Sequence, residues 1–81
     1  AEDLVAGELL LRLKALRSRL AKQARSPAYV IFSDRTLIDM AKRRPRTRAA
    51  FGEVHGVGAA KLAQFADMFL AEISGSAEAA G

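Results

Sequence analysis

The chain has 81 residues, no cysteine, one histidine and a net charge of +4. A chain this short forms one domain with a stability on the order of 5 kcal/mol, which excludes a deep catalytic cleft built around a cofactor. The sequence has no thiol for a disulfide or a metal, no apolar run near the ~20 residues of a membrane span and no visible signal peptide. We therefore expect no cofactor, no metal site and no membrane partner.

The first predicted element is a helix from about residue 7 to residue 25. Its apolar side chains recur at helical spacing and form one stripe, consisting of Leu9, Leu13, Leu16, Leu20 and Ala24. The helix should end at Ser26-Pro27, because proline lacks an N–H and restricts the residue before it.

The next stretch, Ala28 to Phe32, reads AYVIF and has the composition of a strand. No partner strand is visible nearby, and an unpaired strand would leave its backbone groups without hydrogen bonds. We therefore expect a short helical turn between two helices. Val30, Ile31 and Phe32 should lie mostly in the core, and Tyr29 should stay at the surface.

A second long element is predicted at about residues 34 to 43. Ser33 is a favourable N-cap, and Asp34 in the first turn is favoured by the helix dipole. The side chains expected to face inward are Leu37, Ile38, Met40 and Ala41.

Two further helices complete the chain. Thr47 is expected to cap a short helix at about 48 to 54, and a Gly-Val-Gly turn then leads to a last helix at about 59 to 74. The apolar stripe of that last helix consists of Leu62, Phe65, Phe69 and Ile73.

These elements predict an all-α fold, a compact bundle of about five helices that includes one short helical turn and a helix-hairpin-helix-like turn. The domain should span residues 8–74, after a lead-in at 1–7. The small polar residues 75–81 are expected to form a disordered tail.

Charge is distributed unevenly along the chain. Twelve of the thirteen Lys and Arg lie between positions 12 and 48 with two acids, a net +10, whereas the rest of the chain carries −6. Such asymmetry favours a polyanionic partner. The alternative is a solvated basic surface without a partner.

Tyr29 is surrounded in the sequence by Lys22, Arg25 and Arg35. An exposed aromatic ring among cations suits single-stranded nucleic acid, because the ring stacks on a base and the cations hold the backbone. The alternative is a half-buried tyrosine with its hydroxyl in water.

A dense basic segment follows at residues 42–48, where five of seven residues are cations. We predict phosphate contacts here; solvated charge with helix C-capping and a nuclear localisation signal are the alternatives. The cations are Lys42, Arg43, Arg44, Arg46 and Arg48.

The Gly-Val-Gly turn is a candidate phosphate-binding turn, because free amides at the start of a helix and the helix dipole attract anions. It would consist of Gly56, Val57, Gly58 and Lys61. A tight connection without a ligand is the alternative, which the nearby Glu53 favours. His55 is interpreted as a turn residue, and no catalytic arrangement is found.

In this order, the motifs resemble the HRDC domain, the helicase-and-RNase-D C-terminal domain of RecQ-family DNA helicases. The resemblance runs from about Glu8 to Ile73 and rests on PAYVIFSDRTLIDMA, RP-x-T, GVGxxK and the final FLAEI. The chain departs from the family at Phe65-Ala66, where an aromatic-glycine pair is usual, and at Ala28, where proline is common.

The resemblance implies a bundle of about five helices that lies beyond an ATPase core and tunes binding to single-stranded or branched DNA in replication, recombination and repair. It implies that the aromatic residue at Tyr29 contacts the strand, that the fragment is not itself an enzyme, and that its parent is an ATP-dependent DNA helicase. A monomer is expected, at the nucleoid of a bacterial cytoplasm or in a eukaryotic nucleus. The alternatives are a protein-interaction module that docks on the ATPase core and the RNA-binding domain of an RNase D-like exonuclease.

Overall fold

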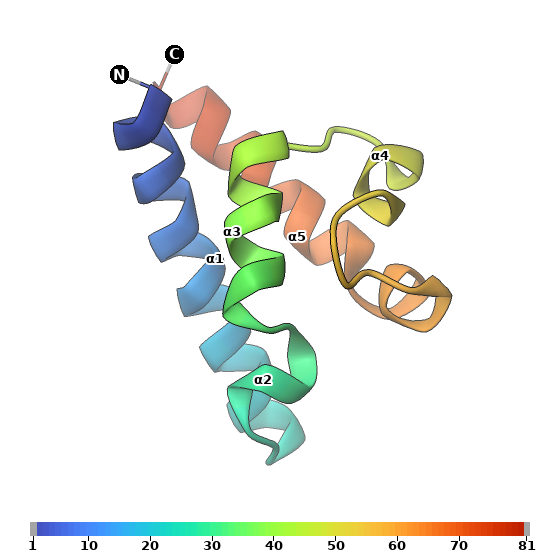
Figure 1. Cartoon of the computed structure of the whole chain (residues 1–81). Coiled ribbons are helices and arrows are strands. Elements are labelled where there is room, and N and C mark those ends of the chain that lie inside the picture. Colours follow the sequence, from blue (N-terminus) through green and yellow to red (C-terminus); the bar gives the residue numbers. More distant parts are fainter. Residues whose placement is uncertain (1, 81) are drawn as a thin grey trace.

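The computed structural model describes the backbone of residues 2–80 and the side chains of residues 6–75. Within that range the chain forms five helices and no strand (Figure 1). The helices are α1 (Glu2–Ala24), α2 (Ala28–Ile31), α3 (Asp34–Arg43), α4 (Arg48–Gly52) and α5 (Ala59–Ala80). The predicted all-α bundle is confirmed, and AYVIF forms a short helical turn as expected.

The predicted domain boundaries remain a prediction. The backbone of α1 and α5 continues into the predicted lead-in at 1–7 and tail at 75–81. Residues 1 and 81, and the side chains of 2–5 and 76–80, lie outside the described part of the chain. None of the helices, over their described residues, is long and apolar enough to cross a membrane.

The helices are arranged around α1 and α5. α1 packs against α2, α3 and α5, and α4 packs against the first half of α5 (Figure 1). The two described ends of the chain lie beside each other at one end of the bundle, and α2 lies at the opposite end (Figure 1). The connection from α4 to α5 runs along the side of α3.

Four phenylalanines form the centre of the core. The ring of Phe32 lies edge-on against Phe51, Phe65 and Phe69, with centroid distances of 6.2, 5.7 and 5.1 Å. All four rings are buried. Such aromatic pairs contribute about 0.5–1.5 kcal/mol each beyond the burial of their area.

The predicted inward faces are confirmed in most positions and wrong in a few. Leu37, Met40 and Ala41 are buried, but Ile38 is 39% exposed. Position 38 is rotated by about 100° from position 37, which turns its side chain out of the core. Val30 is likewise 43% exposed, because a helix of four residues cannot direct every side chain inward.

Both predicted N-caps are confirmed. The hydroxyl of Ser33 accepts a hydrogen bond from the Thr36 amide at 3.2 Å, and that of Thr47 accepts one from the Ala50 amide at 3.1 Å. These bonds satisfy amides that have no partner inside the helix.

Two arginines end helices in the left-handed conformation. Arg25 follows α1 with a φ of 53°, and Arg44 is the C-cap of α3 with a φ of 48°. Glycine adopts this conformation at the end of a helix at less cost than any residue with a Cβ. Both positions therefore sacrifice some stability and retain a cation.

We predict opposite effects of glycine at the C-cap of α3 and at a position two residues earlier, in its last turn. Arg44→Gly should raise the free energy of unfolding by about 1 kcal/mol, because it relieves the left-handed backbone. Lys42→Gly, inside the helix, should lower it by about 1 kcal/mol. Urea denaturation of both variants checks this, and a loss of stability in Arg44→Gly would contradict it.

Candidate nucleic-acid interface

Tyr29 lies at the end of the bundle where α1 gives way to α2. The chain reverses after α1 through the left-handed Arg25 and a hydrogen bond from the Ser26 amide to the Ala21 carbonyl at 3.0 Å. Tyr29 is 73% exposed, whereas Ile31 is buried. Two residues correspond to about 200° around a helix, so a buried Ile31 directs Tyr29 outward. The predicted surface position of Tyr29 is confirmed.

Arg17 of α1 fixes the segment that follows Tyr29. Its guanidinium donates to the carbonyl of Phe32 at 3.0 Å and pairs with the Asp34 carboxylate at 2.8 Å. The Arg17 side chain is 11% exposed, and its contact holds the pKa of Asp34 below the ordinary value. The apolar pattern of α1 does not predict this role, although Arg17 lies directly beside Leu16 of the buried stripe.

We predict that Arg17→Met lowers the free energy of unfolding by about 2 kcal/mol, because it leaves the partly buried Phe32 carbonyl without its charged donor. Arg12→Met is the matched control, since Arg12 is exposed on the same helix and should change stability by less than about 0.5 kcal/mol. Thermal unfolding of the two variants makes the comparison. Equal losses would show that Arg17 is an ordinary surface cation.

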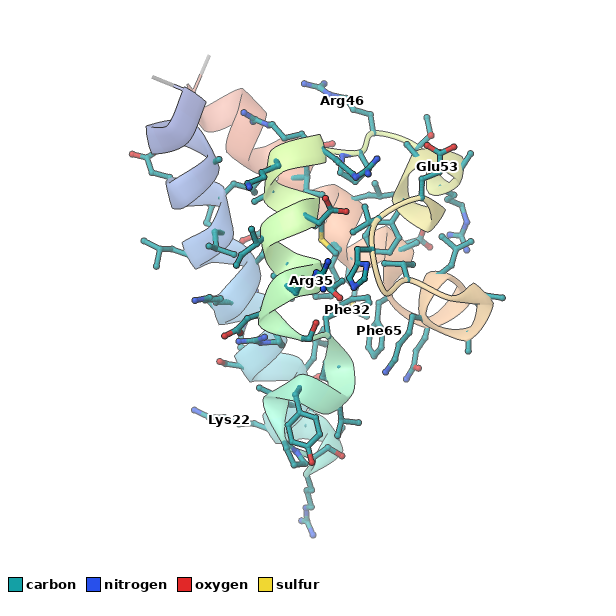
Figure 2. The ribbon with its side chains drawn as sticks, in the orientation of Figure 1. Lys22, Phe32, Arg35, Arg46, Glu53 and Phe65 are labelled. Atoms are coloured by element: carbon teal, nitrogen blue, oxygen red, sulfur yellow. The ribbon has the colours of Figure 1, made fainter. Side chains whose placement is uncertain are left out.

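The structure divides the predicted basic residues into two groups. Lys22 and Arg25 lie with Tyr29 at the end of α1, whereas the cations of the 42–48 segment lie at and beyond the end of α3. Figure 2 shows Lys22 and Arg46 at opposite ends of the molecule, with Arg35 between them. The ten residues of α3 account for about 15 Å of this separation. The cations therefore do not form one compact cluster around Tyr29.

Two of the predicted cations form ion pairs. Arg43 pairs with Asp39 at 2.9 Å, and Arg48 pairs with Asp67 at 2.6 Å. The others form no ion pair with any carboxylate among the described side chains, and all but the half-buried Arg44 are exposed. These cations are Lys22, Arg25, Arg35, Lys42, Arg44 and Arg46.

The structure requires glycine at Gly56, the first glycine of the Gly-Val-Gly turn. Gly56 has a φ of 81°, and a Cβ built on it would lie 2.5 Å from the hydroxyl oxygen of Thr36. Glycine is therefore needed where the connection passes α3. Gly58 is not among the positive-φ residues of the described chain, and a Cβ on it would meet open space.

Lys61 contacts α2 instead of standing free beside the turn. Its ammonium donates to the carbonyl of Val30 and lies 5.5 Å from the centre of the Phe65 ring. These contacts tie α5 to α2. The predicted phosphate-binding role of Gly56, Val57, Gly58 and Lys61 stays a prediction.

Asp39 holds the connection between α4 and α5 against α3. Its Oδ2 accepts two hydrogen bonds, one from the His55 backbone amide at 2.9 Å and one from the Arg43 guanidinium at 2.9 Å. The amide of His55, and to a smaller extent Arg43, lowers the pKa of Asp39. The sequence pattern predicts His55 only as a turn residue and predicts no role for Asp39.

We predict that stability falls as the pH is lowered from about 5 toward 3. When the pKa of a carboxyl group is lowered in the folded state, its ionised form stabilises the fold at pH values above the ordinary pKa of about 4. This stabilisation is lost as the pH falls through the lowered pKa. The pKa values of Asp39 and Asp34 are both lowered, so both carboxylates contribute to the decline. Asp39→Asn should therefore flatten the decline, measured by urea unfolding at a series of pH values. A variant that keeps the full slope of the wild type would contradict this.

Over the described residues, the chain is a bundle of five helices with an exposed tyrosine on its short second helix. Arg35 near the start of α3 and Lys42 near its end form no ion pair with a described carboxylate, and together these features define a small basic helical module. The model of the HRDC domain matches residues 6–73, so the chain belongs to the HRDC family.

Named relatives and a solved structure agree with this assignment. The chain is 41% identical over 63 residues to the ATP-dependent DNA helicase RecQ of Pasteurella multocida, a match that covers 78% of this chain and 10% of the relative. It is 44% identical over 68 residues to the ATP-dependent DNA helicase UvrD2 of Mycobacterium tuberculosis, covering 84% and 10%. It also superposes on the third HRDC domain of Deinococcus radiodurans RecQ with a TM-score of 0.81 and 34% identity, covering 84% of this chain and 90% of that one. The chain thus spans about a tenth of the length of the curated relatives.

Proposed function

We propose that this chain is an accessory nucleic-acid-binding domain of an ATP-dependent DNA helicase and that it binds single-stranded or branched DNA weakly. The observation that carries the proposal is the 73% exposure of Tyr29 on α2. The end of α1 that leads into α2 carries Lys22 and Arg25, which form no ion pair among the described side chains. An exposed aromatic ring that no core packing requires is free to stack on a base.

Binding combines stacking with charge. The Tyr29 ring stacks on one base, while Lys22 and Arg25 at the same end of the bundle contact the flanking phosphates. The affinity should be in the micromolar range or weaker and should fall with salt, because each neutralised phosphate releases counterions. In this scheme arginine is retained at the left-handed position 25, where glycine would be more stable, because the Arg25 side chain contacts a phosphate.

The parent chain is proposed to be a DNA helicase of the RecQ or UvrD2 type. Both names occur among the relatives, and both describe ATP-dependent DNA helicases. These names support DNA over RNA as the ligand, and in this proposal the ATPase lies in a part of the parent outside this chain. Such a domain would act as a monomeric module in the compartment that holds the chromosome.

Docking on a protein is the second candidate function. Val30 is 43% exposed next to Tyr29, and Leu11 on α1 is 69% exposed. The adjacent exposed side chains of Tyr29 and Val30, on a basic part of the chain, also fit an acidic protein surface. The ATPase core of the parent is one such candidate partner. Cross-linking to that core without any affinity for DNA would favour this candidate.

We predict that Tyr29→Ala weakens binding of a labelled single strand by ~1 kcal/mol or more, about fivefold, because stacking is lost. Tyr29→Phe should bind like the wild type, since the ring remains, and Leu11→Ala is a control for an exposed apolar residue elsewhere. Fluorescence anisotropy at low and high salt measures all four proteins. Wild-type binding that is absent at low salt, or unchanged by salt, would refute the proposal, and an unchanged Tyr29→Ala would refute the stacking role.

A further inference from the structure

A shallow groove of about 350 Å³ lies between α3 and the connection from α4 to α5. One wall is the exposed side of α3, and the other is formed by the turn that Asp39 and Gly56 hold in place. The residues that line the groove are Arg35, Ile38, Asp39, Lys42, Arg43 and His55.

The groove is positively charged. Arg35 and Lys42 form no ion pair with a carboxylate among the described side chains. Asp39 is the acid of the lining, and its Oδ2 accepts hydrogen bonds from Arg43 and from the amide of His55. Because Arg35, Lys42 and Arg43 line the groove with this one carboxylate, an anion that enters it meets a net positive charge.

The groove extends from Lys42 and Arg43, in one basic group of the molecule, to Arg35, in the direction of the other basic group. Positions 35 and 42 are seven residues apart on α3, or about 10 Å along the helix. Figure 2 shows Arg35 between Lys22 at one end of the molecule and Arg46 at the other. Ile38, 39% exposed, adds an apolar patch between the two cations. A chain of evenly spaced negative charges with apolar groups between them matches this lining.

We propose that this groove is a second subsite for the phosphodiester backbone of a nucleic-acid strand, in which Arg35 and Lys42 contact phosphates and the wall that carries His55 confines the strand. The inference rests on the proposed function, because the strand is the one that stacks on Tyr29. It extends that function by giving the strand a path along α3.

His55 is suited to this role by its position. Its backbone amide is bound to Asp39, so the residue is held at the wall of the groove. The charged groups that face His55 across the groove are Arg35, Asp39, Lys42 and Arg43 of α3, and Glu53 of its own connection does not line the groove.

The first experiment titrates the whole chain with an oligothymidylate at low and at high salt. The wild type should bind more weakly at high salt, because each neutralised phosphate releases counterions. Binding that does not change with salt overturns the subsite.

The second experiment compares two double variants that remove the same charge. Arg35→Gln with Lys42→Gln should weaken binding several-fold and reduce the salt slope by about 0.7 for each phosphate that the variant no longer neutralises. Arg12→Gln with Arg19→Gln, two exposed cations of α1 outside the groove, is the matched control and should change binding less. Equal effects of the two double variants overturn the groove as a subsite.

Two outcomes separate this inference from the function on which it rests. If Tyr29→Ala weakens binding but the groove variants match their control, the inference fails and the proposed function stands. If the wild type shows no salt-dependent binding of the oligothymidylate, both fail. An oligoglutamate peptide of equal charge that binds as tightly, and that responds to the same groove variants, overturns the assignment of the groove to nucleic acid.

Discussion

The ring of Phe32 lies edge-on against Phe51, Phe65 and Phe69, and its backbone carbonyl accepts a hydrogen bond from Arg17. These contacts come from α1, α4 and α5, so one residue joins three helices. Because both its side chain and its backbone are held, the short α2 before it has one orientation and α3 after it has one starting point. The exposed tyrosine of α2 and the direction of the basic side chains along α3 both depend on this anchor.

The charges of the molecule divide by what they contact. The guanidinium of Arg17 is nearly buried and stabilises the link between α2 and α3, whereas Arg43 and Arg48 form more exposed pairs with carboxylates. Exposed pairs contribute little to stability. The remaining cations of the basic region have no such partner among the described side chains and are available to a polyanion. Net charge alone does not make this distinction, because it counts a buried structural cation and a free one alike.

The connection between α4 and α5 links packing to the proposed binding surface. Gly56 lets it pass close to the Thr36 hydroxyl, and Asp39 holds the His55 amide. The same contacts that attach this turn to α3 create the second wall of the basic groove. His55, a residue of this turn, therefore lies opposite the cations of α3.

Local sequence patterns predict the helices, the caps at Ser33 and Thr47 and the outward position of Tyr29, because these depend on periodicity and on hydrogen bonds between residues a few positions apart. The inward position predicted for Ile38 is wrong because this residue lies at the edge of an apolar stripe, where only the rotation of α3 against its neighbours determines burial. Other features follow only from the folded arrangement: Arg17 bonds to a carbonyl fifteen residues away, His55 faces α3 and the cations form two separated groups. Such features arise from contacts between segments far apart in the chain, and no local pattern encodes their geometry.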